Sequence, residues 1–181
     1  MKILLLNGSP RPNGNTAAAL DEMEAVFAAE GLETERVQVG NRVIRGCIAC
    51  GKCAELGRCV FDDLVNELAP KLEACDGLVV GSPVYYASAN ATLVALLTRL
   101  FYSTPFDKTM KVGAAVAAAR RGGLSSTLAV HSTWVLPQRI RQDPSANLLI
   151  LGMISTGRSS SCFLPSMRVM DNFLSICRIV S

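Results

Sequence analysis

A polar loop near the start of the chain has the residue types of an anion-binding site. It runs from Asn7 to Thr16, between a short apolar run and a stretch with the hydrophobic spacing of a helix. The first N–H groups of a helix have no partner within it and lie at the positive end of its dipole, so they attract anions. The side chains that add donors or charge are Ser9, Arg11, Asn15 and Thr16. The loop has neither the G-x-x-x-x-G-K-[ST] nor the G-x-G-x-x-G pattern, so it is neither of the two best-known phosphate loops. Its Ser, Asn and Thr donors predict a site for a terminal phosphate monoester, with an ordinary strand-to-helix connection as the alternative.

Four cysteines form a second group that could do chemistry. The spacing C-x2-C-x2-C-x5-C involves Cys47, Cys50, Cys53 and Cys59. Four thiolates within thirteen residues can hold one iron–sulfur cubane, and the spacing is close to the C-x2-C-x2-C-x3-C-P run of bacterial ferredoxins. It differs in the last gap and in having Val60 where that run has proline. Two alternatives stay open: zinc, whose structural sites usually split into two separated pairs, and thiols that are structural or redox-active without a cluster.

Composition and charge exclude several functional classes. The 181 residues are 50% hydrophobic and carry a formal net charge of +3. The arginines are scattered rather than clustered with aromatic residues, which argues against nucleic-acid binding. The chain has no apolar run of about 18 residues, so no membrane span is expected, and it enters a strand at once, which leaves no room for a signal peptide. These features predict a cytoplasmic protein, in which seven cysteines favour metal or redox chemistry over structural disulfides.

Alternating strand and helix patterns must position both groups. Apolar runs predict strands at 2–8, 34–39, 78–80 and 112–118. Helical spacing predicts a helix over 15–30, a second one that begins at Asp62 or Asp63, and a third one capped by Asn90. Pro70 falls inside the second helix and is expected to kink or split it. The apolar stripe of the third helix contains Leu93, Leu96, Leu97 and Leu100.

This alternation predicts one α/β domain over residues 1–181 with a parallel sheet covered on both faces. Three polar loops follow the predicted strands, at 7–16, 81–90 and 119–123. Ligands of such sheets bind at the carboxyl ends of the strands, near the point where the strand order reverses. We therefore expect the three loops to face one ligand.

Three segments together resemble the flavodoxin-like NAD(P)H-dependent FMN reductases. Asn7-Gly8-Ser9-Pro10-Arg11 with Gly14-Asn15-Thr16 resembles their FMN phosphate loop. Gly81-Ser82-Pro83-Val84-Tyr85-Tyr86 resembles their second flavin loop. Lys111-Val112-Gly113, leading to Arg120-Arg121-Gly122-Gly123, resembles their fourth strand and third loop. The resemblance covers residues 1–127, and the cysteine loop is similar to that of the iron–sulfur flavoprotein branch.

The resemblance implies a flavodoxin-like three-layer sandwich whose parallel sheet has the strand order 2-1-3-4-5, with FMN at its edge. It implies that the FMN phosphate is held by Ser9, Arg11, Asn15 and Thr16. The isoalloxazine ring would lie against Pro83, Val84, Tyr85 and Tyr86, and its other edge would be approached by Ala119, Arg120 and Gly122. Hydride chemistry belongs to the flavin, so no catalytic acid or base is nominated.

The function implied by the resemblance is an FMN-dependent NAD(P)H oxidoreductase. NAD(P)H would be its co-substrate, and the acceptor would be a quinone, flavin, azo or nitro compound. The alternative is an iron–sulfur flavoprotein that carries electrons to or from a redox protein, with a 4Fe-4S cluster on the four cysteines. A homodimer or homotetramer is expected, because in similar proteins the cluster can face the flavin of a neighbouring subunit.

The composition changes after about residue 124. Residues 124–181 contain five arginines and two aspartates but no lysine or glutamate. Apolar spacing predicts a fifth strand within 147–154 and a final helix over 166–180. Two explanations of this divergent tail, residues 128–181, stay open. One is a reading-frame change near residue 125, and the other is a diverged but folded end.

Overall fold

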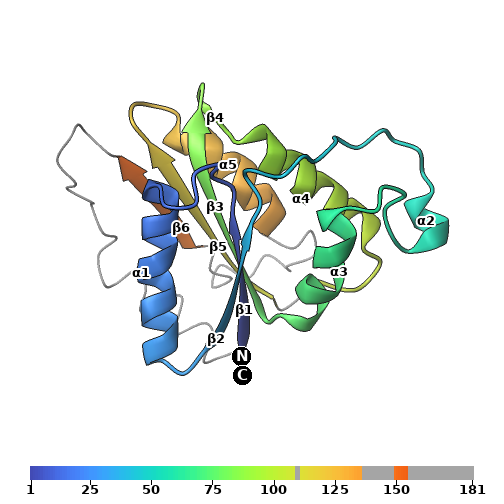
Figure 1. The fold of residues 1–181 in the computed structure, drawn as a ribbon, viewed down its shortest axis with the longest axis horizontal. Coiled ribbons are helices and arrows are strands. Elements are labelled where there is room, and N and C mark those ends of the chain that lie inside the picture. Colours follow the sequence, from blue (N-terminus) through green and yellow to red (C-terminus); the bar gives the residue numbers. More distant parts are fainter. Residues whose placement is uncertain (109–110, 136–148, 155–181) are drawn as a thin grey trace.

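The computed structural model of the chain describes residues 1–108, 111–135 and 149–154. Its centre is a parallel sheet with the order β2-β1-β3-β5-β6, and the two-residue strand β4 pairs with the end of β3 (Figure 1). The strands are β1 (Lys2–Asn7), β2 (Glu33–Gln38), β3 (Gly77–Tyr85), β4 (Ser88–Ala89), β5 (Val112–Ala119) and β6 (Leu149–Ile154). Because β4 is only the return arm of a hairpin, the long strands follow the predicted flavodoxin-like order 2-1-3-4-5, which is confirmed.

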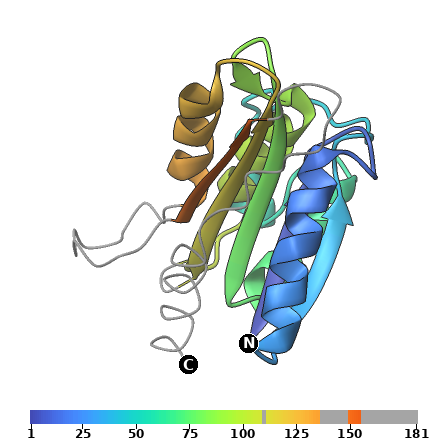
Figure 2. The ribbon, with the colours of Figure 1, turned by 90° about the vertical axis from the view of Figure 1, so that its left-hand side faces the viewer.

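Helices cover both faces of the sheet. Helix α1 (Asn15–Ala29) packs on one face, and α3 (Leu64–Ala74) and α4 (Ala91–Ser103) pack on the other. Helix α5 (Leu124–Val135) contacts β5 and β3, and α2 (Cys53–Leu56) is a single turn within the cysteine loop. Figure 2 shows α1 lying along the sheet, with its N-terminal end beside the carboxyl ends of the strands.

The core explains why β1 is apolar from Ile3 to Leu6. Ile3 and Leu5 pack in the cluster under α1, whereas Leu4 and Leu6 pack in the cluster under α3 and α4. All four side chains are fully buried. Successive side chains of a strand point to opposite faces, so the part of β1 that is covered on both faces is apolar at consecutive positions.

The ends of the helices on the second face also follow from local sequence. Asp63 Oδ1 accepts a hydrogen bond from Val65 N at 3.1 Å and caps α3. Asn90 caps α4 in the same way, and the predicted leucine stripe of α4 is fully buried. Helix α3 continues through Pro70 as one helix, so the expected split does not occur.

The C-terminal part is described only in one segment. Strand β6 lies within the strand predicted at 147–154 and pairs in parallel with Ala114–Ala119 of β5. The predicted helix at 166–180 lies outside the described residues. The single-domain assignment and the two explanations of the tail therefore stay predictions. Among the described segments, no helix is long and apolar enough to cross a lipid bilayer.

Candidate functional site

The loop between β1 and α1 has one buried side and one exposed side. Ser9 and Thr16 are buried, with 5% and 2% of their surface exposed, whereas Arg11 and Asn15 are exposed. Ser9 Oγ accepts a hydrogen bond from Arg11 N at 3.2 Å, which tightens the turn. Gly14 precedes α1 and has no side chain to cap it. The start of α1 therefore offers backbone donors to an anion, as the sequence predicts.

Residues in and just after strand β2, which is distant in sequence, hold this loop in position. Asn7 Nδ2 donates to Gln38 Oε1 at 2.9 Å, and Gln38 Nε2 donates to the carbonyl oxygen of Ser9. Ser9 N in turn donates to Asn7 Oδ1 at 3.0 Å. Gly40 lies so close that an added Cβ would be 2.2 Å from the carbonyl carbon of Ser9. The sequence analysis missed Gln38 and Gly40, since no motif marks them.

The second predicted loop is a β-hairpin whose tip is exposed. Val84 pairs with Ala89 and Tyr85 with Ser88, so Tyr86 and Ala87 are the two turn residues. Both have positive φ angles, 49° and 62°. Such turns favour asparagine and glycine, and other residues at these angles are strained by about 1–3 kcal/mol each. Tyr85 is 49% exposed and Tyr86 is fully exposed, so neither ring is used to fill the core.

The third predicted loop lies against this hairpin. Ala119 is buried at the end of β5, whereas Arg120 and Gly122 are exposed. Ser126 Oγ donates to the carbonyl oxygen of Ala87 at 2.6 Å. Gly123 has a φ of +98°, and an added Cβ there would be 2.7 Å from Ala87 Cα. The chain after β5 is therefore held in contact with the tip of the hairpin.

Asn90 joins the first loop to the second. Its Nδ2 donates to the carbonyl oxygen of Gly8 at 2.8 Å, and its backbone N donates to Ser82 Oγ at 3.0 Å. Gly8 N also donates to the carbonyl oxygen of Gly81 at 2.7 Å. Figure 1 shows the three loops at the same end of the sheet, away from the N-terminus. The structure thus brings together the loops that carry the eleven residues predicted to bind the flavin, while each residue's own role stays a prediction.

Replacing Asn90 tests this connection. We expect Asn90→Ala to lower the free energy of unfolding by about 2 kcal/mol, because it removes the α4 cap and leaves the buried Gly8 carbonyl without this partner. Urea unfolding would measure the change, and quenching of flavin fluorescence would show weaker FMN binding. Asn41→Ala is the control, since Asn41 is exposed. Equal stability of the two variants would contradict the structural role given to Asn90.

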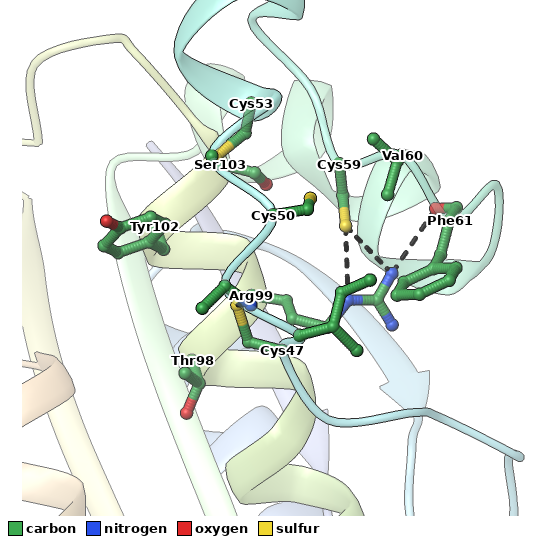
Figure 3. A pocket seen from close by; sticks show the side chains of 13 residues that line it. Cys47, Cys50, Cys53, Cys59, Val60, Phe61, Thr98, Arg99, Tyr102 and Ser103 are labelled. Carbon is green, nitrogen blue, oxygen red and sulfur yellow. Dashed lines mark hydrogen bonds between the residues drawn. The ribbon is translucent and has the colours of Figure 1, made fainter.

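The four predicted cysteines line one cavity. The cavity has a volume of about 300 Å³ and lies between the cysteine loop and α4 (Figure 3). Helix α4 contributes four side chains that the sequence analysis missed: Thr98, Arg99, Tyr102 and Ser103. Cys47 and Cys50 are exposed, and Cys53 and Cys59 are half-buried. Among the described residues, no group of three or more His, Cys, Asp or Glu side chains has the geometry to hold a single metal ion.

The backbone of the cysteine loop turns sharply between its first cysteines. Ala49 and Gly51 have φ angles of 54° and 71°, in the left-handed region. Ala49 N donates to Cys47 Sγ at 3.4 Å. Hydrogen bonds to ligating sulfurs are among the contacts that tune an iron–sulfur cluster. Asn66 holds the other end of the loop, where its side chain bonds both the N–H and the carbonyl of Cys59 at 3.1 and 3.0 Å.

A buried arginine lies behind Cys59. Arg99 is 1% exposed, and its Nε and Nη2 donate to Cys59 Sγ at 3.3 and 3.2 Å. The same guanidinium donates to both carboxylate oxygens of Asp63, at 2.7 and 3.0 Å. Burial acts to lower the pKa of Arg99, but the hydrogen bonds that Arg99 donates to Asp63 and Cys59 outweigh it and raise that pKa above its usual value. Arg99 is therefore a permanent cation next to a predicted cluster ligand.

Cys75 is a thiol of a different kind. It lies at the end of α3, outside the cavity, and is 1% exposed. Burial raises the pKa of its thiol above the usual value, and its Sγ donates to the carbonyl oxygen of Leu72 at 3.3 Å. Cys75 is thus a buried core residue that lies apart from the four cavity cysteines.

A doubly covered parallel sheet of flavodoxin-like order, with three polar loops at its carboxyl end, defines a flavodoxin-like protein. The chain belongs to the NADPH-dependent FMN reductase family, whose model matches residues 1–140. The match runs past residue 127, where the resemblance was expected to end. FMN is the cofactor of this family, and the chain is accordingly a flavin-dependent oxidoreductase.

Two relatives that match most of the chain are iron–sulfur flavoproteins. The chain is 37% identical to an iron–sulfur flavoprotein of Methanocaldococcus jannaschii over 157 residues, which are 81% of this chain and 80% of the relative. It is 36% identical to an iron–sulfur flavoprotein of Methanosarcina thermophila over 139 residues, covering 75% and 73% of the two chains. An NAD(P)H:quinone oxidoreductase from Methanothermobacter marburgensis shares the fold, with a TM-score of 0.65, 14% identity and coverage of 99% and 94%.

Proposed function

We propose that this chain is an electron-transfer flavoprotein that moves electrons between FMN and a 4Fe-4S cluster bound by Cys47, Cys50, Cys53 and Cys59. The observation that carries the proposal is that all four thiols line one cavity. The donor set fits the group, because iron–sulfur clusters are held by cysteine thiolates and tuned by hydrogen bonds to sulfur. A cluster separates its ligating sulfurs more widely than a single ion does, which suits an open 300 Å³ cavity.

The cofactors supply the redox chemistry, since a bound flavin exchanges a hydride or single electrons and a bound cluster exchanges single electrons. The protein supplies binding and orientation. Ser9, Arg11, Asn15 and Thr16 would hold the FMN phosphate at the N-terminus of α1, which begins at Asn15. The hairpin of Pro83, Val84, Tyr85 and Tyr86 would bind the ring from one side, and Ala119, Arg120 and Gly122 would contact its other edge. Gln38 and Asn90 keep the loops in position through hydrogen bonds to backbone carbonyls.

The partner that we propose for the cluster is a redox protein of acidic surface. Residues 41–58 around the cavity contain four basic side chains, Arg42, Arg45, Lys52 and Arg58, and one acidic side chain, Glu55. All of them are exposed. Surface charge of one sign steers partners of the opposite sign and accelerates encounter. A homodimer or homotetramer and a cytoplasmic location remain part of the proposal.

A second candidate function is an NAD(P)H oxidoreductase that reduces small acceptors such as quinones, flavins, azo or nitro compounds. The hairpin favours it, because Tyr86 at its tip is fully exposed, so a small acceptor would reach a flavin ring bound there. The two functions differ in turnover. A carrier oxidises NADH and NADPH slowly with small acceptors, whereas an oxidoreductase turns them over at ordinary enzymatic rates of about 1–1000 per second.

The first experiment is purification without oxygen, followed by an absorption spectrum and assays of flavin, iron and sulfide on the same sample. Flavin bands over a broad brown absorbance, with iron and sulfide present, support the carrier. Flavin bands without iron leave the oxidoreductase as the function of this chain and rule out the cluster. Steady-state oxidation of NADH and NADPH with a quinone then measures the rate that separates the two candidates.

A matched pair of cysteine variants tests the ligand set. We expect Cys50→Ser to lose most of the bound iron, because serine is a poor ligand for a cluster that needs thiolates. Cys75→Ser should keep wild-type iron, since Cys75 lies outside the cavity and serine can still donate to the Leu72 carbonyl. Iron analysis of both variants decides the assignment. Full iron in Cys50→Ser would contradict it.

A further inference from the structure

The guanidinium of Arg99 meets the Cys59 sulfur with two of its N–H groups. Nε and Nη2 lie 3.3 and 3.2 Å from Sγ, so one edge of the guanidinium donates two hydrogen bonds to a single sulfur (Figure 3). Arg99 lies on α4, 40 residues along the chain from Cys59. None of the other three cavity cysteines receives a charged donor among the hydrogen bonds described. Cys59 is thus distinguished from Cys47, Cys50 and Cys53 by a cation.

Arg99 is held so that it cannot turn away from this sulfur. Its remaining N–H groups donate to the two carboxylate oxygens of Asp63 and, at 3.1 Å, to the carbonyl oxygen of Arg45. Its guanidinium carbon lies 5.0 Å from the centre of the Phe61 ring. Only 1% of the surface of Arg99 is exposed, so solvent ions barely screen its charge. The Asp63 carboxylate, which is 26% exposed, cancels part of that charge.

We propose that Arg99 and Asp63 together set the reduction potential of the cluster through the Cys59 sulfur, with Arg99 raising it and Asp63 limiting the rise. This inference rests on the proposed cluster. On reduction, one electron enters the cluster and no covalent bond forms or breaks. The reduced cluster is more negative by one charge, so a nearby cation and N–H donors to a ligand sulfur stabilise it more than the oxidised cluster. Asp63 bonds Arg99 and not the Cys59 sulfur, so it is a positioning residue whose negative charge also offsets that of Arg99.

Replacing Arg99 and replacing Asp63 should therefore shift the midpoint potential of the cluster in opposite directions. Arg99→Gln removes the positive charge, so at a fixed potential the ratio of oxidised to reduced cluster should rise about tenfold. For a one-electron couple this corresponds to a fall of about 59 mV in the midpoint potential. Asp63→Asn leaves Arg99 uncompensated and should raise the midpoint potential, while its Oδ1 can still cap α3. Arg99→Lys keeps the charge but loses the two-pronged contact, and its potential should lie between Arg99→Gln and wild type.

The measurement is an anaerobic spectroelectrochemical titration of the full-length protein with dithionite as reductant, with iron and sulfide assayed in each variant. Arg45→Gln is the control, because it removes an exposed arginine two residues before Cys47 and should shift the potential less than either partner. Shifts of opposite sign for Arg99→Gln and Asp63→Asn are expected, since general loosening of the loop would move both the same way.

The outcomes separate this inference from the function on which it rests. Wild-type protein that holds no iron overturns both the cluster and the inference. A wild-type cluster whose potential is unchanged in the variants, or moves in the same direction in both, overturns the inference and leaves the cluster in place. Where Arg99→Gln fails to assemble a cluster, Arg99→Lys and Asp63→Asn decide, because a potential equal to wild type in both overturns the inference.

Discussion

Replacing Gly40 by alanine should abolish tight FMN binding. An added Cβ would lie 2.2 Å from the carbonyl carbon of Ser9 and 2.3 Å from the carbonyl oxygen of Gly8. Both atoms belong to the backbone of the proposed phosphate loop, so relief requires moving the loop itself. Overpacking of this kind costs up to about 3 kcal/mol. Since about 1.4 kcal/mol is a tenfold change in affinity, the Kd for FMN should rise roughly a hundredfold.

Gly46→Ala is the matched control for this prediction. An added Cβ at Gly46 meets no atom within 4 Å. Fluorescence titration of the apoproteins with FMN measures both affinities, and urea unfolding reports whether either variant is destabilised. Wild-type FMN affinity in Gly40→Ala would contradict the position of the phosphate site. A loss in both variants would show that the effect is not specific to the contact with Ser9.

Removing the Asp63 carboxylate should produce the second large effect, on stability. Asp63 is the carboxylate paired with the buried Arg99, and it also caps α3. Deleting one partner of a buried ion pair costs about 3–5 kcal/mol, because the other charge is left without its counter-ion. Asp63 is 26% exposed, so we expect the lower end, about 3 kcal/mol, for Asp63→Ala.

The neighbouring Asp62 provides the control. Its side chain is 84% exposed, and its ion pair with Arg58 spans 3.5 Å at the surface. Surface pairs contribute about 0–1 kcal/mol, so Asp62→Ala should barely change the denaturant midpoint. The double variant Asp63→Ala with Arg99→Met should be more stable than Asp63→Ala alone, since it removes the orphaned charge. Equal destabilisation by Asp62→Ala and Asp63→Ala would contradict the buried pair.

Much of the fold follows from local sequence patterns. The run Ile3 to Leu6 predicts a strand buried on both faces, and each of its side chains is fully buried between α1 and the α3–α4 layer. The leucine stripe of α4 predicts which side of that helix meets the sheet. These predictions succeed because burial leaves a pattern in adjacent residues: a continuous apolar run in a strand covered on both faces, and a helical period in a helix covered on one. The family resemblance supplied the strand order.

Other expectations failed or were incomplete for physical reasons. Pro70 removes one N–H from α3, yet the helix continues through it, since Leu68 and Leu72 on either side of Pro70 are buried in the core. Arg99 was missed because a charged residue on an amphipathic helix is ordinarily solvated. Here the cysteine loop folds over it, and the side chain becomes 1% exposed.

The sequence by itself determined which residues could do chemistry: the polar loop after β1 and four cysteines whose spacing suits one cluster. Only the tertiary structure decided what holds them. Gln38 reaches Ser9 across 29 residues, Arg99 reaches Cys59 across 40, and Asn90 reaches Gly8 across 82. Such contacts depend on how helices and loops pack against the sheet. Periodicity reports that a residue faces the interior, but it does not report which distant residue it will meet there.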